Sequence, residues 1–66
     1  MMNISNCKRY VLVRNGLYLT HDPLTMTNSA YNAKQYKNRM EALNEAKLYQ
    51  AKIRVFNPVT GEITYG

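Results

Sequence analysis

Asn15-Gly16 stands between two short apolar segments and constrains the fold more than any other feature of the sequence. This dipeptide supplies the two positive-φ positions of a type I′ turn, so the flanking segments are predicted to form a β-hairpin. The turn fixes the register, and the predicted cross-strand pairs are Arg14 with Leu17, Val13 with Tyr18, Leu12 with Leu19 and Val11 with Thr20. Because side chains alternate along a strand, one face carries Tyr10, Leu12, Leu17 and Leu19, and the other carries Val11, Val13, Tyr18 and Thr20.

The sequence Asn38-Arg39-Met40-Glu41 predicts the start of a helix that runs to about Gln50. The Asn38 side chain can accept from the backbone N–H of Glu41 while the Glu41 side chain reaches back, which is a capping-box arrangement. The side of this helix predicted to dock on a sheet carries Met40, Ala42, Leu43, Ala46 and Tyr49. The side predicted to face solvent carries Glu41, Asn44 and Glu45.

Strand patterns follow the predicted helix at residues 51–56 and 63–65, and the segment 57–62 between them has the composition of a turn. Residues 21–32 are polar and are interpreted as a long loop with room for a short extended piece. Tyr36 is predicted to point inward, either from a short third strand or from the lead-in to the helix.

These elements predict the α+β fold class, a small two-layer domain of order β-β-(β)-α-β-β with one helix packed on an antiparallel sheet. Residues 8–66 form this domain, and residues 1–7 are interpreted as a loose lead-in. One helix can cover only one face of such a sheet, so the second hairpin face is predicted to be exposed unless a partner covers it. Tyr and Arg are enriched where binding energy concentrates. The partner-binding candidates are Arg14, Tyr18, Val11, Val13, Tyr31, Lys37 and Arg54.

The charge balance favours an anionic partner. Nine Lys and Arg against four Asp and Glu give a formal net charge of +5. Such a surplus favours nucleic acid or an acidic protein surface as partner, although the basic residues are scattered along the chain. The sequence has no signal-peptide pattern and no long apolar segment, so we expect a cytoplasmic protein with no membrane partner.

The residues that could carry chemistry are few and isolated. Cys7 and His21 are single, and a structural zinc site needs about four ligands. Glu41 and Glu45 lie one helical turn apart, but no third ligand or base is placed to join them. We therefore expect no metal, no cofactor and no catalytic residues, and hence a protein that is not an enzyme.

Two resemblances to known families accompany these patterns. The stretch "LYLTHDP…NAKQYKNRMEALNEAK" resembles small accessory proteins of bacteriophages and prophages, with matching residues Asn15, Gly16, Tyr18, Ala33, Lys34, Tyr36, Glu41, Ala42 and Ala46. The pieces "RNGLY" and "DPLT" are similar to the arm-type DNA-binding domain of phage integrases, although "DPLT" lacks that family's glycine. The second resemblance implies a sheet placed in the DNA major groove, with Arg14, Tyr18 and Lys37 as contacts.

Three functions follow as hypotheses. The first is a phage-encoded binding protein that docks on a host protein, one that handles nucleic acid or acts in defence, and inhibits or redirects it. The second is a DNA- or RNA-binding module that uses the sheet. The third is a structural or interaction protein that buries the uncovered sheet face in a homodimer.

Overall fold

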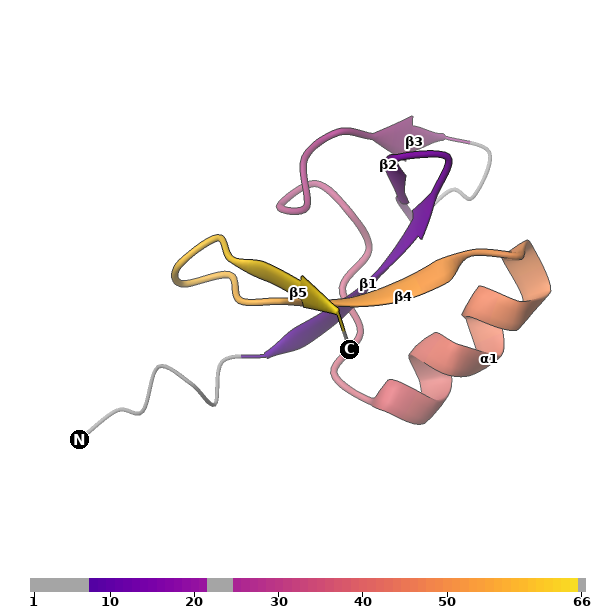
Figure 1. Ribbon diagram of the computed structural model, residues 1–66. Coiled ribbons are helices and arrows are strands. Elements are labelled where there is room, and N and C mark those ends of the chain that lie inside the picture. Colours follow the sequence, from indigo (N-terminus) through magenta and orange to yellow (C-terminus); the bar gives the residue numbers. More distant parts are fainter. Residues whose placement is uncertain (1–7, 22–24, 66) are drawn as a thin grey trace.

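The computed structural model describes residues 8–21 and 25–65, which form one helix and an open five-stranded antiparallel sheet (Figure 1). The elements in chain order are β1 (Arg9–Arg14), β2 (Leu17–Leu19), β3 (Met26–Thr27), α1 (Arg39–Tyr49), β4 (Lys52–Phe56) and β5 (Ile63–Tyr65). The strand order is β3-β2-β1-β4-β5, and α1 packs against the two central strands, β1 and β4. The predicted α+β class is confirmed. Residues 1–7, predicted to be a loose lead-in, and residues 22–24 of the predicted loop lie outside the described residues.

The hairpin turn forms as predicted. Asn15 and Gly16 have φ values of 55° and 81°, and the pairs Val13–Tyr18 and Arg14–Leu17 are in register. A type I′ turn needs positive φ at both central positions, which asparagine and glycine tolerate best. The hairpin is therefore fixed by its local sequence.

The longer pairing predicted for this hairpin is wrong, because β2 separates from β1 after two pairs. The segment leading to α1 takes its place beside β1: the N–H groups of Tyr10 and Tyr36 each donate to the other residue's carbonyl oxygen, at 2.7 and 2.8 Å. Lys34 N–H donates to the carbonyl oxygen of Leu19 at 3.1 Å, which ties the same segment to β2. The third strand of the sheet is Met26–Thr27, and the Tyr36 side chain points inward as predicted.

The helix begins at the predicted Asn38 cap, but the return bond predicted from the Glu41 side chain to the Asn38 N–H does not form. Asn38 Oδ1 accepts from the backbone N–H groups of Met40 and Glu41, at 2.8 and 3.4 Å. The helix ends at Gln50, whose left-handed backbone (φ 55°) lets its N–H donate to the carbonyl oxygens of Ala46 and Lys47. Local side-chain chemistry thus sets the first turn, and a left-handed residue sets the last.

The docking side of α1 differs from the prediction at Met40, which is 64% exposed. The buried side is centred on Ala42 and Ala46. At about 100° per residue, Met40 lies about 160° from Ala42, whereas Glu45 lies only about 60° from it. Met40 therefore points to solvent, and Glu45 lies at the edge of the packed side.

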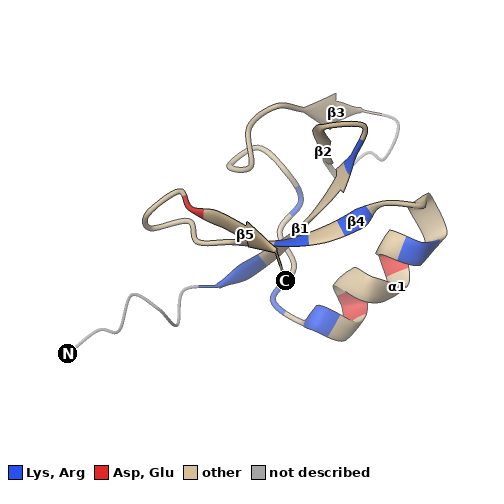
Figure 2. Cartoon of the chain, viewed as in Figure 1, with Lys and Arg blue, Asp and Glu red and all other residues tan. Residues whose placement is uncertain are grey.

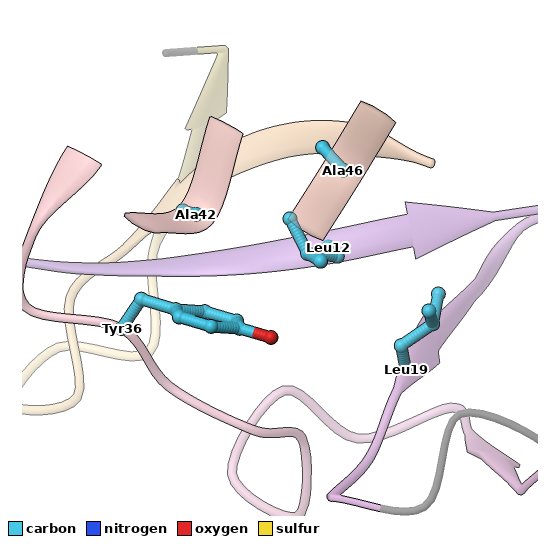
Figure 3. Packing of buried hydrophobic residues seen from close by; sticks show 5 residues of the cluster. All are labelled: Leu12, Leu19, Tyr36, Ala42 and Ala46. Carbon is cyan, nitrogen blue, oxygen red and sulfur yellow. The ribbon is translucent and has the colours of Figure 1, made fainter. Parts of the chain in front are cut away.

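The main core lies between α1 and the sheet (Figure 3). Its buried members are Leu12, Leu19, Tyr36, Ala42 and Ala46, and half-buried Tyr10, Met26, Tyr49, Ala51 and Ile53 pack around them. The two alanines have no long side chain, so α1 approaches β1 and β4 closely and the larger residues come from the sheet and from Tyr36. This core joins residues from almost the whole described chain.

A second, smaller core lies on the opposite face of the sheet and corrects the prediction that this face is bare. Val11 and Phe56 are 0% and 1% exposed there, packed with Ala30 and Ala33 from the turn between β3 and α1. Val11 is therefore not a contact residue for a partner. The prediction is wrong because Ala30, within the predicted polar loop, and Ala33, just after it, place small apolar side chains on the sheet. Among the described residues, this face stays uncovered toward the hairpin turn and at the β5 edge, where Tyr65 is 85% exposed.

Candidate functional site

The strands carry positive charge only. β1 contributes Arg9 and Arg14 and β4 contributes Lys52 and Arg54, and none of the five strands contains Asp or Glu. Among the described residues, the acidic ones lie on α1 and in the connection between β4 and β5 (Figure 2). The two central strands, β1 and β4, therefore carry cations with no carboxylate on the same strand to neutralise them.

Three of these four cations line one hollow beside the hairpin turn. This open hollow of about 670 Å³ is bounded by Arg14, Lys52 and Arg54, together with Val13, Asn15 and Gln50. The carboxyl end of α1, at Gln50, brings a partial negative charge of about half a unit to this region. Three full positive charges outweigh that contribution, so the hollow favours anions.

Arg54 connects the hollow to an exposed tyrosine on the neighbouring strand. Its guanidinium carbon lies 4.4 Å from the ring centroid of Tyr65, which faces Arg54 across the β4–β5 pair. One N–H of Arg54 also donates to its neighbour's carbonyl oxygen, Ile53 O, at 2.8 Å, which holds the side chain. Tyr65 is 85% exposed, so one face of its ring meets the cation and the rest meets solvent. We refer to Arg14, Lys52, Arg54 and Tyr65 as the basic patch.

The structure brings some of the predicted contact residues together at this patch. Arg14 and Arg54 belong to it, and half-buried Val13 lines the hollow beside them. Half-buried Tyr18, predicted as a contact residue, packs instead against the second core. By register Arg14 shares its face with Leu17 rather than with Val13, but at the last position of β1 it still lines the hollow.

Two other predicted contact residues lie away from the basic patch. Tyr31 is 58% exposed, but its ring packs edge-on against Phe56, so it helps to close the second core. Lys37 is exposed just before α1, whose length of about 16 Å separates it from the hollow beside Gln50. Both side chains thus lie outside the surface that the cations form.

Sequence reasoning missed Lys52 and Tyr65 as members of the patch. Lys52 lies two residues before Arg54 on one strand, so alternation alone places both on the same face. Tyr65 follows from the register of the second hairpin, in which Arg54 pairs with Tyr65 and Phe56 pairs with Ile63. Both positions can thus be derived from the sequence if β4 and β5 are assumed to pair as a hairpin.

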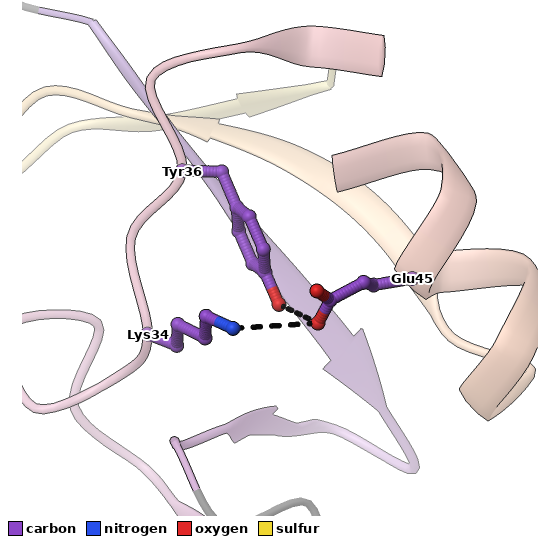
Figure 4. Close-up of polar contacts among 3 residues, drawn as sticks. All are labelled: Lys34, Tyr36 and Glu45. Carbon is purple, nitrogen blue, oxygen red and sulfur yellow. Dashed lines mark hydrogen bonds and ion pairs between the residues drawn. The ribbon is translucent and has the colours of Figure 1, made fainter. Parts of the chain in front are cut away.

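A half-buried polar cluster joins the segment before α1 to the helix (Figure 4). The Tyr36 hydroxyl donates to Glu45 Oε1 at 2.5 Å, and Lys34 Nζ lies 3.5 Å from the same oxygen. Burial, and then the hydrogen bond to Glu45, raise the pKa of Tyr36 well above its ordinary value of 10.0. The prediction that Glu45 lies on a solvated helix face is therefore wrong. The hydrogen bond from the Tyr36 phenol to this carboxylate ties α1 to the segment that precedes it.

Groups that could hold a metal ion are absent from the described part of the chain, where no three His, Cys, Asp or Glu side chains gather. In residues 8–21 and 25–65, no helix has the length and apolar character needed to cross a membrane. Comparisons with protein-family models, with curated proteins and with solved structures find no match for this chain.

Proposed function

We propose that this protein is a non-enzymatic binding module that holds nucleic acid at the basic patch, on the uncovered end of its sheet. The observation that supports this proposal is the convergence of Arg14, Lys52 and Arg54 on one hollow, with no acidic residue lining it. Such a gathering of like charges repels itself, and an anion relieves that repulsion. A polyanion relieves it best, since several phosphates bind at once.

The size of the patch sets the expected strength of binding. Three cations can contact about three phosphates, which is a small number of phosphate contacts for a nucleic-acid-binding domain. We therefore expect dissociation constants of about 10⁻⁴ to 10⁻⁶ M at physiological salt. The patch has no side chain on a rigid helix that could enter the major groove, so we expect little sequence preference.

The test is binding of labelled oligonucleotides, followed by fluorescence anisotropy, for the wild-type protein and two triple variants. The patch variant carries Arg14→Gln, Lys52→Gln and Arg54→Gln. The control variant carries Lys8→Gln, Lys37→Gln and Arg39→Gln, three exposed cations outside the patch, and so loses the same charge. We expect the patch variant to lose binding at least tenfold more than the control. Equal losses in both variants would mean that net charge, and not this surface, attracts nucleic acid.

A second candidate function is docking on a host protein, as an accessory protein of a bacteriophage that inhibits or redirects its target. It is favoured by Met40 and Leu48, which are 64% and 70% exposed on the outward side of α1. Both side chains are mostly exposed, and apolar side chains grouped on one exposed surface are typical of protein contact surfaces. Both candidates place the protein in the cytoplasm.

The second candidate is tested with bacterial lysate treated with nuclease. It predicts a stoichiometric protein partner that the wild-type chain retains and that the double variant Met40→Glu and Leu48→Glu loses. Absence of such a partner contradicts it. Light scattering on the same preparations tests the homodimer, which predicts twice the monomer mass at high protein concentration.

A further inference from the structure

We infer that the basic patch selects single-stranded nucleic acid, with a phosphate in the hollow and an unpaired base stacked on the open face of Tyr65. This inference rests on the proposed function and names its substrate class. It depends on the juxtaposition of an anion-binding hollow and an exposed ring, joined by the side chain of Arg54.

The Tyr65 ring is placed for stacking on one side only. The guanidinium of Arg54 lies 4.4 Å from the ring centroid and occupies one face. The ring is 85% exposed and belongs to neither hydrophobic core, so the fold gains little from it. A cation held against one face of a phenol limits the ring's rotation and leaves the other face to a ligand. Nucleobases are flat and stack on such faces with little regard to sequence.

The same geometry disfavours a duplex. In a duplex each base is already stacked on both sides, and taking it out of the stack costs a few kcal/mol. A duplex can therefore use the cations of the patch but cannot use the Tyr65 ring. A single strand can use both, because its bases turn away from one another freely. Discrimination between the two forms should thus depend on Tyr65, whereas binding of either form depends on the cations.

The width of the uncovered sheet surface also limits the number of nucleotides that can bind at one time. From β2 across β1 and β4 to β5 there are three interstrand steps, or about 14 Å. Half-buried Val13 lies toward one side of this span, next to Tyr18, which packs against the second core, and Tyr65 lies at the other side. A surface of this width holds only a few nucleotides, so a probe of about ten nucleotides is long enough, within the usual site sizes of small single-strand-binding domains.

Tyrosine-to-tryptophan substitution provides a direct readout, because the chain contains no tryptophan. Tyr65→Trp introduces a single fluorophore at the stacking position. Leu48→Trp introduces one on the exposed side of α1, away from the patch, as the matched control. Both variants are titrated with oligothymidylate of about ten nucleotides and with a duplex of the same length, and total binding is followed in parallel by anisotropy of the labelled oligonucleotide.

We expect the single strand to quench the tryptophan at position 65 in step with the anisotropy change, and to leave the one at position 48 unchanged. Tyr65→Leu should weaken single-strand binding at least fivefold and duplex binding less than twofold. Binding that depends on the patch cations, but with equal affinity for duplex and no quenching at position 65, would overturn this inference and leave the proposed function standing. Absence of any nucleic-acid binding would overturn both.

Discussion

The ring of Tyr31 meets the ring of Phe56 edge-on, with their centroids 4.9 Å apart and their planes at 89°. Tyr31 belongs to the turn between β3 and α1, and Phe56 is the last residue of β4. This contact carries the turn across the sheet face that α1 does not cover, where Ala30 and Ala33 enclose Val11. The domain therefore has a core on each side of its sheet, which leaves the described part of this face uncovered only toward the hairpin turn and at the β5 edge.

Removal of the Tyr31 ring should destabilise the fold without affecting the binding surface. Tyr31→Ala removes an edge-to-face aromatic pair and exposes part of Phe56, so we expect a loss of about 1–2 kcal/mol in the free energy of unfolding. In a domain of this size, each kcal/mol lowers the melting temperature by about 4–8 °C. The control is Tyr65→Ala, an exposed tyrosine whose removal should cost less than about 0.5 kcal/mol. Equal melting temperatures for the two variants would mean that the turn does not close a second core.

Gly61 should be intolerant of a side chain for two separable reasons. Its φ is +79°, and a Cβ added there would lie 2.9 Å from the Tyr31 hydroxyl. Gly16 has nearly the same φ, +81°, but a Cβ there would meet nothing within 4 Å. Gly16→Ala thus measures the cost of the left-handed backbone alone, about 1–2 kcal/mol. We expect Gly61→Ala to cost more.

The excess cost of Gly61→Ala should disappear when the Tyr31 hydroxyl is removed. In a Tyr31→Phe background the nearest remaining atom is the ring carbon at 3.8 Å, an ordinary van der Waals distance. Thermal unfolding of the two single variants and the double variant gives the interaction energy directly. Additive effects would contradict the contact between Tyr31 and the β4–β5 turn.

Tyr36 should make the fold sensitive to alkaline pH. Burial and the hydrogen bond to Glu45 raise its pKa in the folded state, whereas in the unfolded chain it ionises near 10.0. The contribution of Tyr36 to the free energy of unfolding is therefore fully present below about pH 10. As the pH rises further the unfolded state has released a proton that the folded state still holds, so the stability falls by about 1.4 kcal/mol per pH unit until the folded pKa is reached.

The comparison that isolates this effect is wild type against Tyr36→Phe, unfolded by denaturant at a series of pH values. Below pH 10 the wild type should be more stable by about 1.5–3 kcal/mol, the usual value of a hydrogen bond to a charged group. Above pH 10 the difference should shrink. A difference that stays constant through this range would contradict a hydroxyl held protonated against Glu45.

Elements that depend on local chemistry could be predicted from the sequence. The Asn15-Gly16 turn and the Asn38 cap each need only a few neighbouring residues, and both form as expected. The alternation of Arg54 and Phe56 against Ile53 and Val55 along β4 is equally local, and the structure confirms it.

Features that depend on distant segments could not be predicted in the same way. The departure of β2 from β1 results from the arrival of Lys34 and Tyr36 between them, about twenty residues further along the chain. The burial of Val11 results from Ala30 and Ala33, and no local pattern indicates which strand two alanines in a polar turn will cover. The basic patch lies between these cases: its residues come from strands that were recognised, but their grouping depends on which strands pair.

The most direct test of the central claim is the salt dependence of single-strand binding. About three phosphate contacts predict a slope of about −2 for log Kobs against log[NaCl], since each contact with a single strand contributes about −0.7. Arg54→Gln should make the slope shallower by about 0.7, and Arg39→Gln, an exposed cation on α1, should leave it unchanged. A slope near zero, or one that Arg39→Gln changes as much as Arg54→Gln does, would contradict the claim that the basic patch holds nucleic acid.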